Sequence, residues 1–162
     1  MGFFKDLFGS KSTQSEPQQT KAQTYGEMAS GVFDGLSIEQ RGAILCTQFM
    51  FAGFTFHTPA QSVAMQMVES MQTALKLTRT EAEMYSAKYN EPEKLIFMMK
   101  TINNQGAMDL VIYNSYGLVL LSGRKDGVEV LYNFFAELGY SRQAVNDVVD
   151  KIEALGNLMR NL

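Results

Sequence analysis

The chain has 162 residues, of which 46% are hydrophobic and 19% are charged, a composition typical of one globular domain with an appendage. The net charge is -3 and the fourteen Lys and Arg residues are scattered, which argues against a nucleic-acid partner, because such a partner requires a concentrated positive field. Cys46 is the only cysteine, which excludes an intrachain disulfide, and its place in an apolar run predicts a small buried side chain in a reducing compartment.

The first ten residues, MGFFKDLFGS, combine large apolar side chains with a few charges. As a helix, this segment gathers four apolar side chains on one side: Phe3, Phe4, Leu7 and Phe8. Lys5 lies on the other side, a composition typical of a short helix in the headgroup region of a membrane. Asp6 interrupts the apolar stretch, so the segment matches neither a secretory signal nor the myristoylation pattern. We predict weak membrane contact through residues 1–8, and two alternatives stay open: a groove on the same chain, or another protein.

Residues 9–24, GSKSTQSEPQQTKAQT, contain no apolar side chain larger than Ala22. Ser, Thr, Gln, Lys and Pro dominate, and such a segment cannot bury enough surface to offset the entropy of ordering it. The sequence therefore predicts three parts: an amphipathic segment at 1–8, a flexible linker at 9–24, and a folded domain at 25–162.

Helix-start signals recur through the folded domain. The predicted capping residues are Ser37, Thr58, Thr78 and Ser141. The first three precede a Gln or Glu that completes a capping box, and Pro59 follows Thr58 at the favoured first helical position. Apolar residues recur at three- and four-residue steps between these signals. The resulting helices are predicted at 38–54, 59–76, 79–89, 92–103, 107–121, 126–138 and 142–155, with a short one near 25–34.

The passage DLVIYNSYGLVLLSGRKDGVEVLY, residues 109–132, allows two interpretations. The segments NSYG and RKDG fit turns of a β-meander, whereas a fully buried helix is equally apolar and shows no clearer period. An internal comparison favours the helix: when the chain is shifted along itself so that the cap Thr78 falls on Ser141, ALKLTRTEAEMYSAKY aligns with ELGYSRQAVNDVVDKI. We therefore predict an all-α bundle of seven to eight helices with an approximate internal duplication.

This pattern of a buried helix, a loop, a helix, LKLT or LGYS, and another helix resembles the tellurite-resistance TerB-like domain over about 38–155. The resemblance implies an all-helical bundle with an internal repeat, of a type often used in membrane-associated or stress-response assemblies. It also implies acidic metal ligands in the loops after the buried helices. The matching loops here, GFTFHTP and SGRKDG, hold a single acid, Asp126, and we therefore expect no metal and no cofactor.

No phosphate-binding loop, nucleotide fingerprint or nucleophile elbow occurs, and no catalytic residue is predicted. Methionine is abundant, with eleven in the chain. Met65 lies about 100° from the inward stripe of its predicted helix, while Met98 and Met99, being adjacent, point in different directions on theirs. Some of these side chains must therefore lie at an edge, and the candidates for a partner-binding groove are Met65, Met98 and Met99. The other interpretation of these methionines is soft filling of the core.

These patterns favour a non-enzymatic interaction or adaptor domain that binds another protein. We expect a cytoplasmic protein that reaches the inner face of the membrane as a peripheral protein through residues 1–8. The alternative is a small ligand-binding protein or enzyme with a pocket between the two repeats. That pocket would be formed near His57, Tyr113, Tyr116 and Arg124.

Overall fold

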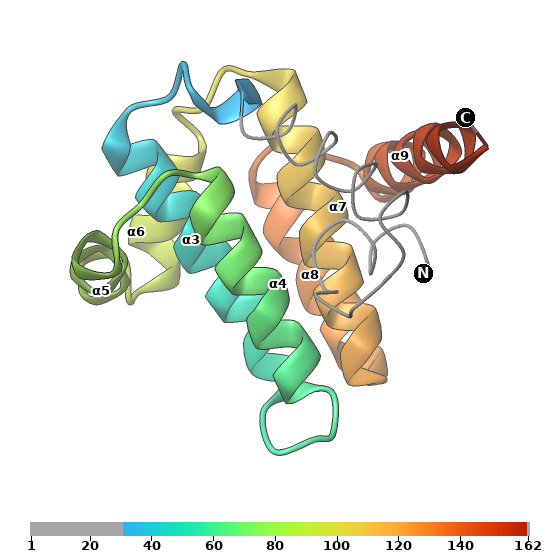
Figure 1. Ribbon diagram of the computed structural model, residues 1–162, viewed down its shortest axis with the longest axis horizontal. Coiled ribbons are helices and arrows are strands. Elements are labelled where there is room, and N and C mark those ends of the chain that lie inside the picture. The colour runs from blue at the N-terminus through green and yellow to red at the C-terminus, as the bar shows by residue number, and fades with distance from the viewer. Residues whose placement is uncertain (1–30, 162) are drawn as a thin grey trace.

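The computed structural model describes residues 31–161, and all regular secondary structure in this range is helical (Figure 1). The elements are α3 (Ile38–Ala52), the 3-10 helix η2 (Gly53–Thr55), α4 (Gln61–Ala74), α5 (Arg79–Lys88), α6 (Pro92–Met99), α7 (Gln105–Ser122), α8 (Lys125–Glu137) and α9 (Arg142–Arg160). The predicted all-α bundle is confirmed. Residues 1–8, the linker 9–24 and most of the short helix expected near 25–34 lie outside the described residues.

Helix α7 decides between the two interpretations of residues 109–132. The side chain of Asn104 caps its start by accepting a hydrogen bond from the backbone N–H of Ala107 at 3.0 Å. Gly123 ends it in the left-handed conformation, with φ 69°. The helix is confirmed and the β-meander is wrong. Because α7 is buried around most of its circumference, it is apolar on every side, and this explains why the sequence shows no helical period there.

Three predicted caps are confirmed by side-chain hydrogen bonds to the backbone, at Ser37, Thr78 and Ser141. The capping box predicted at Thr58 is wrong, because α4 begins at Gln61 without a side-chain cap. The Thr58 hydroxyl instead donates to the carbonyl oxygen of Thr55 at 2.6 Å, within the turn that follows η2. Local turn bonds of this kind compete with helix capping for the same hydroxyl.

The internal duplication is visible at the helix boundaries. The shift that places Thr78 on Ser141 also places the end of α4 on the end of α8, and the start of α5 on the start of α9. The turns between them match as well: the N–H of Leu77 donates to the carbonyl of Gln72 at 3.2 Å, and the N–H of Tyr140 donates to that of Phe135 at 2.9 Å. In each turn the residue before the donor has a positive φ, 55° at Lys76 and 95° at Gly139. Both turns are therefore Schellman motifs at equivalent positions.

The first helix of each half matches with a slightly larger shift. This second shift places Ile38, which begins α3, on Gln105, which begins α7, and it places Thr55 on Ser122. The difference arises in the following loop, which is longer in the first half (56–60) than in the second (123–124). With this shift the buried stretch 42–48 of α3 falls on 109–115 of α7, which is also buried.

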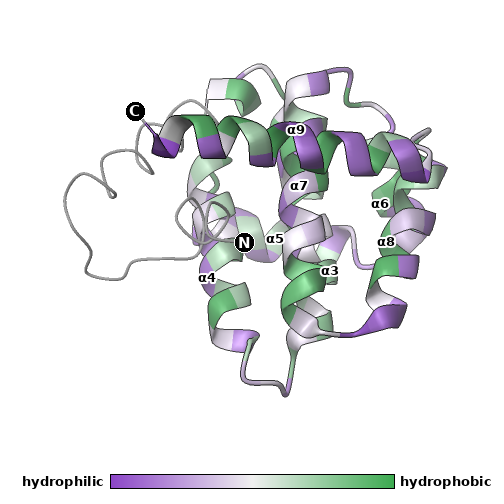
Figure 2. Ribbon diagram, turned by 90° about the vertical axis from the view of Figure 1, so that its right-hand side faces the viewer, coloured by the Kyte–Doolittle hydropathy of each residue, from purple (hydrophilic) through white to green (hydrophobic). Residues whose placement is uncertain are grey.

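The two long apolar helices, α3 and α7, pack against each other in the centre of the molecule. Each is flanked by its own pair, α4 and α5 on α3, and α8 and α9 on α7, while α6 also packs on α3. Helices α5 and α9 consequently lie on opposite sides of the bundle (Figure 1). Along α9, polar and apolar residues alternate at helical spacing, and this helix runs across one face of the molecule (Figure 2).

Candidate partner-binding groove

A groove of about 510 Å³ opens between the ends of α5 and α6, beside the start of α3. Its lining residues are Glu39 of α3, Lys88 and Tyr89 at the end of α5, and Glu93, Lys94, Phe97 and Met98 of α6. We call this set the α5–α6 groove. Its volume lies within the range of pockets that hold small molecules or a few anchoring side chains.

The α5–α6 groove results from a sharp turn of the chain. The N–H of Tyr89 closes α5 by donating to the carbonyl of Tyr85 at 2.9 Å, and α6 begins at Pro92. A proline is well placed in the first turn of a helix and forces the preceding residue into an extended conformation, as at Glu91 (φ -114°, ψ 135°). Helix α5 therefore cannot continue, and the two helices diverge around an open space.

Phe97 is the most prominent feature of the groove. Helix α6 buries Leu95 and Met99 against α3, which leaves Phe97 on its outer side with 72% of its surface exposed. Burying a side chain of this size is worth about 1.5–3 kcal/mol relative to leaving it in water. Among the residues of 31–161 whose burial is described, which leave out Met159, no other large hydrophobic side chain is as exposed, so the groove presents an apolar anchor to the surface.

The polar wall of the groove is a set of paired side chains. Glu39 accepts hydrogen bonds from the Lys88 ammonium at 2.8 Å and from the Tyr89 hydroxyl. The bond from Lys88, and then that from Tyr89, lowers the pKa of Glu39 below its ordinary value. Desolvation, followed by the neighbouring Glu39, raises the pKa of Tyr89 above its ordinary value. Tyr89 is thus a protonated donor and Glu39 an ionised acceptor near neutral pH, which suits recognition better than proton transfer.

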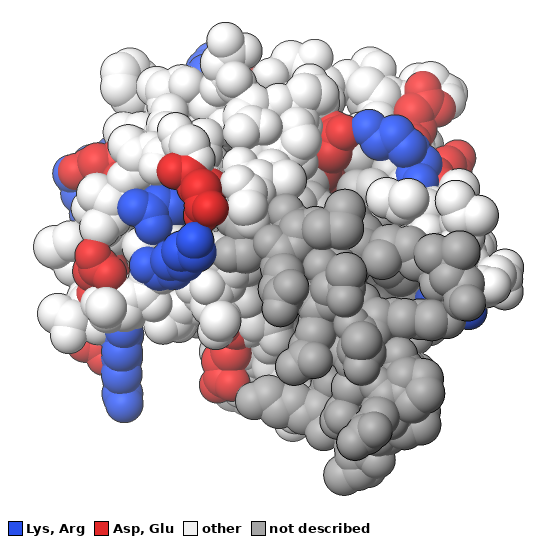
Figure 3. Space-filling view, turned by 45° about the horizontal axis from the view of Figure 1, so that its top comes forward, with Lys and Arg blue, Asp and Glu red and all other residues white. Residues whose placement is uncertain are grey.

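The remaining charges differ in their pairing. Lys94 lies 3.7 Å from Glu91, whereas Glu93 makes no ion pair with any residue in the range 31–161. Among the described residues on the face drawn in Figure 3, Lys and Arg side chains lie next to Asp and Glu side chains. Glu93 is therefore a local carboxylate available to an incoming positive charge.

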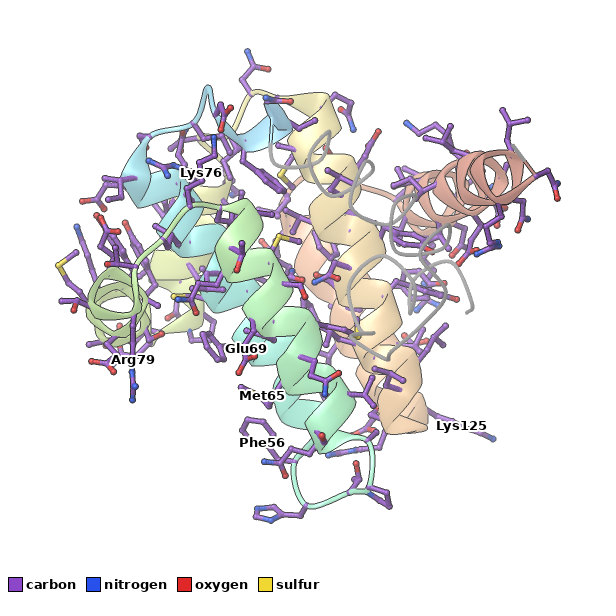
Figure 4. All side chains as sticks on the ribbon, in the orientation of Figure 1. Phe56, Met65, Glu69, Lys76, Arg79 and Lys125 are labelled. Carbon is purple, nitrogen blue, oxygen red and sulfur yellow. The ribbon has the colours of Figure 1, made fainter. Side chains whose placement is uncertain are left out.

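The three candidate methionines lie in different places. Met98 lines the α5–α6 groove, whereas Met99 is 1% exposed and belongs to the hydrophobic core. Met65 lies in the first half of α4 and is half-buried (Figure 4). The structure therefore brings only Met98 to the groove. Phe97 was not among the predicted site residues, because its exposure follows from the way α6 packs Leu95 and Met99 against α3.

The four residues of the alternative pocket have different neighbours. His57 is exposed, in the loop before α4, and Arg124 lies over the ring of Phe54 at 5.2 Å. Tyr113 is buried and donates a hydrogen bond to Glu153 of α9 at 2.6 Å. Desolvation raises the pKa of Tyr116, which lies beside Tyr132 of α8. These contacts do not gather the four side chains around one cavity.

Metal ligands do not cluster in residues 31–161, where no group of three or more His, Cys, Asp or Glu side chains could hold an ion. Asp126 is paired with Arg124, whose guanidinium donates at 3.0 Å and lowers the pKa of this carboxyl. Burial raises the pKa of the Cys46 thiol to about 11, which leaves it protonated near neutral pH. Within the described part of the chain, no helix is both long and apolar enough to cross a membrane.

Comparison of the chain with models of known protein families, with curated proteins and with solved structures gives no match. The fold itself defines the class: an all-α bundle whose two halves share helix order and turn geometry.

Proposed function

We propose that this protein is a non-enzymatic interaction domain that binds a segment of another protein in the α5–α6 groove. The exposure of Phe97 at the groove is the observation that carries this proposal. Aromatic side chains beside a few polar groups are typical of sites where a protein anchors a partner. Met98 adds an adaptable apolar surface next to this ring.

Binding is favoured over chemistry by the state of the polar groups in the groove. Tyr89 is held protonated and Glu39 ionised, and Lys88 is engaged by that carboxylate. A general base or nucleophile would need a pKa tuned towards the working pH, and these shifts run the other way. The groove therefore supplies hydrogen-bonding and charged contacts rather than an activated group.

We also propose that the domain is TerB-like in architecture. The matched Schellman turns, the matched caps and the central pair α3 and α7 support this assignment, because the resemblance implied a duplicated unit of a buried helix followed by two amphipathic helices. Its proposed setting is the cytoplasm, with peripheral attachment to the inner face of the membrane through the apolar side chains of residues 1–8.

The groove is tested by co-purification with the intact chain as bait. We compare the parent with Phe97→Ser and with Leu158→Ser, a matched control whose side chain is 63% exposed on α9. The expected result is a defined set of proteins recovered by the parent and the control but not by Phe97→Ser. Equal recovery by all three chains would contradict the proposed use of the groove.

Membrane attachment is tested by flotation with anionic vesicles, comparing the parent with Phe4→Ser/Phe8→Ser. Each side chain could contribute about 1.5–3 kcal/mol at full burial, and partial insertion reduces this heavily. We expect weak flotation of the parent and its loss in the double variant, with an unchanged unfolding midpoint. Equal flotation of the two chains would contradict the membrane proposal.

A further inference from the structure

We infer that the α5–α6 groove is occupied, in the partner-free protein, by residues 1–8 of the same chain. This inference rests on the proposed role of the groove as a binding site, and it assigns that site an internal occupant which an outside partner must displace. Three independent features support it: the chemistry of the groove, its pairing of charges, and its position relative to the start of the described chain.

The chemistry of the groove favours aromatic side chains. Phe97 and Met98 form its apolar part, and both residue types make favourable edge and sulfur contacts with aromatic rings. The N-terminal segment MGFFKDLF supplies three phenylalanines and a leucine on one helical side. In the remaining sequence before the described residues, from 9 to 30, the only large aromatic side chain is Tyr25.

The charges are complementary as well. Lys88 is paired with Glu39 and Lys94 with Glu91, which leaves Glu93 as the lining charge without an ion pair in residues 31–161. Residues 1–8 contain one basic side chain, Lys5. Docking with Lys5 towards Glu93 places a positive charge next to this carboxylate, which favours one orientation of the segment.

The described chain begins close to the groove. The carbonyl of Val32 accepts a hydrogen bond from the side chain of Asn104 at 3.1 Å, and the Gln40 side chain bonds to the carbonyl of Thr101 at 3.2 Å, just beyond the end of α6. Glu39 lines the groove and comes seven residues after Val32, so the groove lies within about 25 Å of the start of the described chain.

The linker and residues 25–30 together are long enough to cover this distance. The composition of residues 9–24 predicts a flexible coil, whose sixteen residues would have a root-mean-square span of about 22 Å. A linker of matching length gives an effective concentration in the millimolar range. An intrinsic affinity as weak as about 1 mM would then dock the segment in about half of the molecules.

The test uses a spin label on the full chain. Ser10→Cys provides the attachment site, while Cys46 is buried and its thiol has a pKa raised to about 11, so it reacts slowly. Proximity of the label is read as loss of amide NMR signal. We expect about a two-fold loss across Glu93–Met98, in proportion to half occupancy, and no comparable loss along α8. Phe4→Ser/Phe8→Ser and Phe97→Ser should each restore the signals.

The charge contribution has a matched pair of variants. Glu93→Lys should weaken the signal loss, whereas Glu137→Lys, at an exposed position at the end of α8, should not. A sample mixing spin-labelled chains without isotope and isotope-labelled chains without spin label distinguishes a second copy from the same chain. Three results would each overturn the inference. They are a loss of signal in that mixture, no loss in a chain that carries both the spin label and the isotope, and a loss that Phe97→Ser does not change.

The result is separable from the test of the proposed function. If partner recovery depends on Phe97 but the spin label causes no loss across α6, the internal occupant is wrong and the proposed function stands. If the label does report docking but partner recovery is indifferent to Phe97, docking stands and the proposed function is wrong. Docking also predicts that Phe97→Ser floats with the vesicles better than the parent does. The variant should release Phe3, Phe4 and Phe8 from the groove, which leaves them free to bind the vesicle.

Discussion

The junction of α5 with α3, which sets one wall of the α5–α6 groove, depends on a glycine inside a helix. Gly42 lies in the second turn of α3, and a Cβ built there would come within 2.7 Å of the Cδ2 atom in the ring of Tyr85. The same Cβ would lie 2.9 Å from the Cβ of Tyr85, an atom that no rotamer change can move away. Tyr85 in turn stacks on Tyr89, with ring centroids 6.1 Å apart. Gly42 therefore allows α5 to approach α3 closely.

The substitution Gly42→Ala sets two opposing effects against each other. Helix propensity alone favours alanine over glycine by about 1 kcal/mol. Overpacking of a close helix contact costs about 1–3 kcal/mol, and the separations here place the cost towards the upper end. We expect a net loss of about 1–2 kcal/mol in the free energy of unfolding. In a chain of this size each kcal/mol lowers Tm by about 2–4 °C.

A second glycine provides the control. Gly53, at the end of α3, has helical φ and ψ (-56°, -28°), and a Cβ there would meet no atom within 4 Å. Gly53→Ala should therefore be stabilising, by up to about 1 kcal/mol. Urea unfolding followed by circular dichroism measures both changes. If Gly42→Ala also stabilises the protein, the close approach of Tyr85 to α3 is wrong.

Three further expectations concern the turns, the groove and the loops. At the equivalent turn positions, Gly139→Ala should cost about 1–2 kcal/mol because φ is 95°, whereas Lys76→Gly should be neutral or stabilising in urea unfolding. The pKa of Glu39 is lowered from its ordinary value of 4.5. Its contribution to the free energy of unfolding is therefore fully present above about pH 4.5 and is lost as the pH falls through the lowered pKa. Tyr89→Phe should therefore flatten the acid limb of the stability curve, measured by unfolding from about pH 7 to about pH 3. Asp126→Ala should leave Tm as insensitive to calcium and magnesium as the parent, and a metal-dependent rise that this variant abolishes would show a site.

Local signals predicted most of the fold. The caps at Ser37, Thr78 and Ser141 depend on a hydroxyl and the next turn of backbone, so the sequence contains all the information needed. The cap predicted at Thr58 was wrong because the Thr58 hydroxyl donates to the carbonyl of Thr55 in the preceding turn. This turn follows η2, which the sequence analysis did not predict. The sequence of α7 has no helical period, but the internal comparison aligned it with the first half of the chain, where the corresponding helix was already predicted.

The groove depends on tertiary contacts that one sequence does not display. Phe97 becomes an exposed anchor only because α6 turns Leu95 and Met99 towards α3, and that direction follows from the packing of α6 on α3. Glu39 joins Lys88 and Tyr89, which lie far from it in the sequence, without any motif spacing. Such pairs are set by helix docking, so no local pattern predicts them.

The contact between the two halves contains a buried polar cluster. Gln48 of α3 and Ser115 of α7 are both fully buried, and the Gln48 amide donates to the Ser115 hydroxyl at 2.9 Å. These two positions are equivalent under the shift that places the start of α3 on the start of α7. The Asn114 amide donates to the side-chain oxygen of Gln48, while its own side-chain oxygen has no hydrogen-bond partner among the described residues. Equivalent residues that meet each other indicate an approximate two-fold relation between α3 and α7.

Removing one member of this cluster should destabilise the protein more than removing all of them. Gln48→Leu leaves the Asn114 amide and the Ser115 hydroxyl buried without their partner, and should cost about 1–3 kcal/mol for each group left unsatisfied. Adding Asn114→Leu and Ser115→Ala removes those groups, so the triple variant should recover most of the loss. Urea unfolding of the single, double and triple variants measures this coupling. Losses that simply add would contradict it, because additivity is expected only of sites that do not share hydrogen bonds.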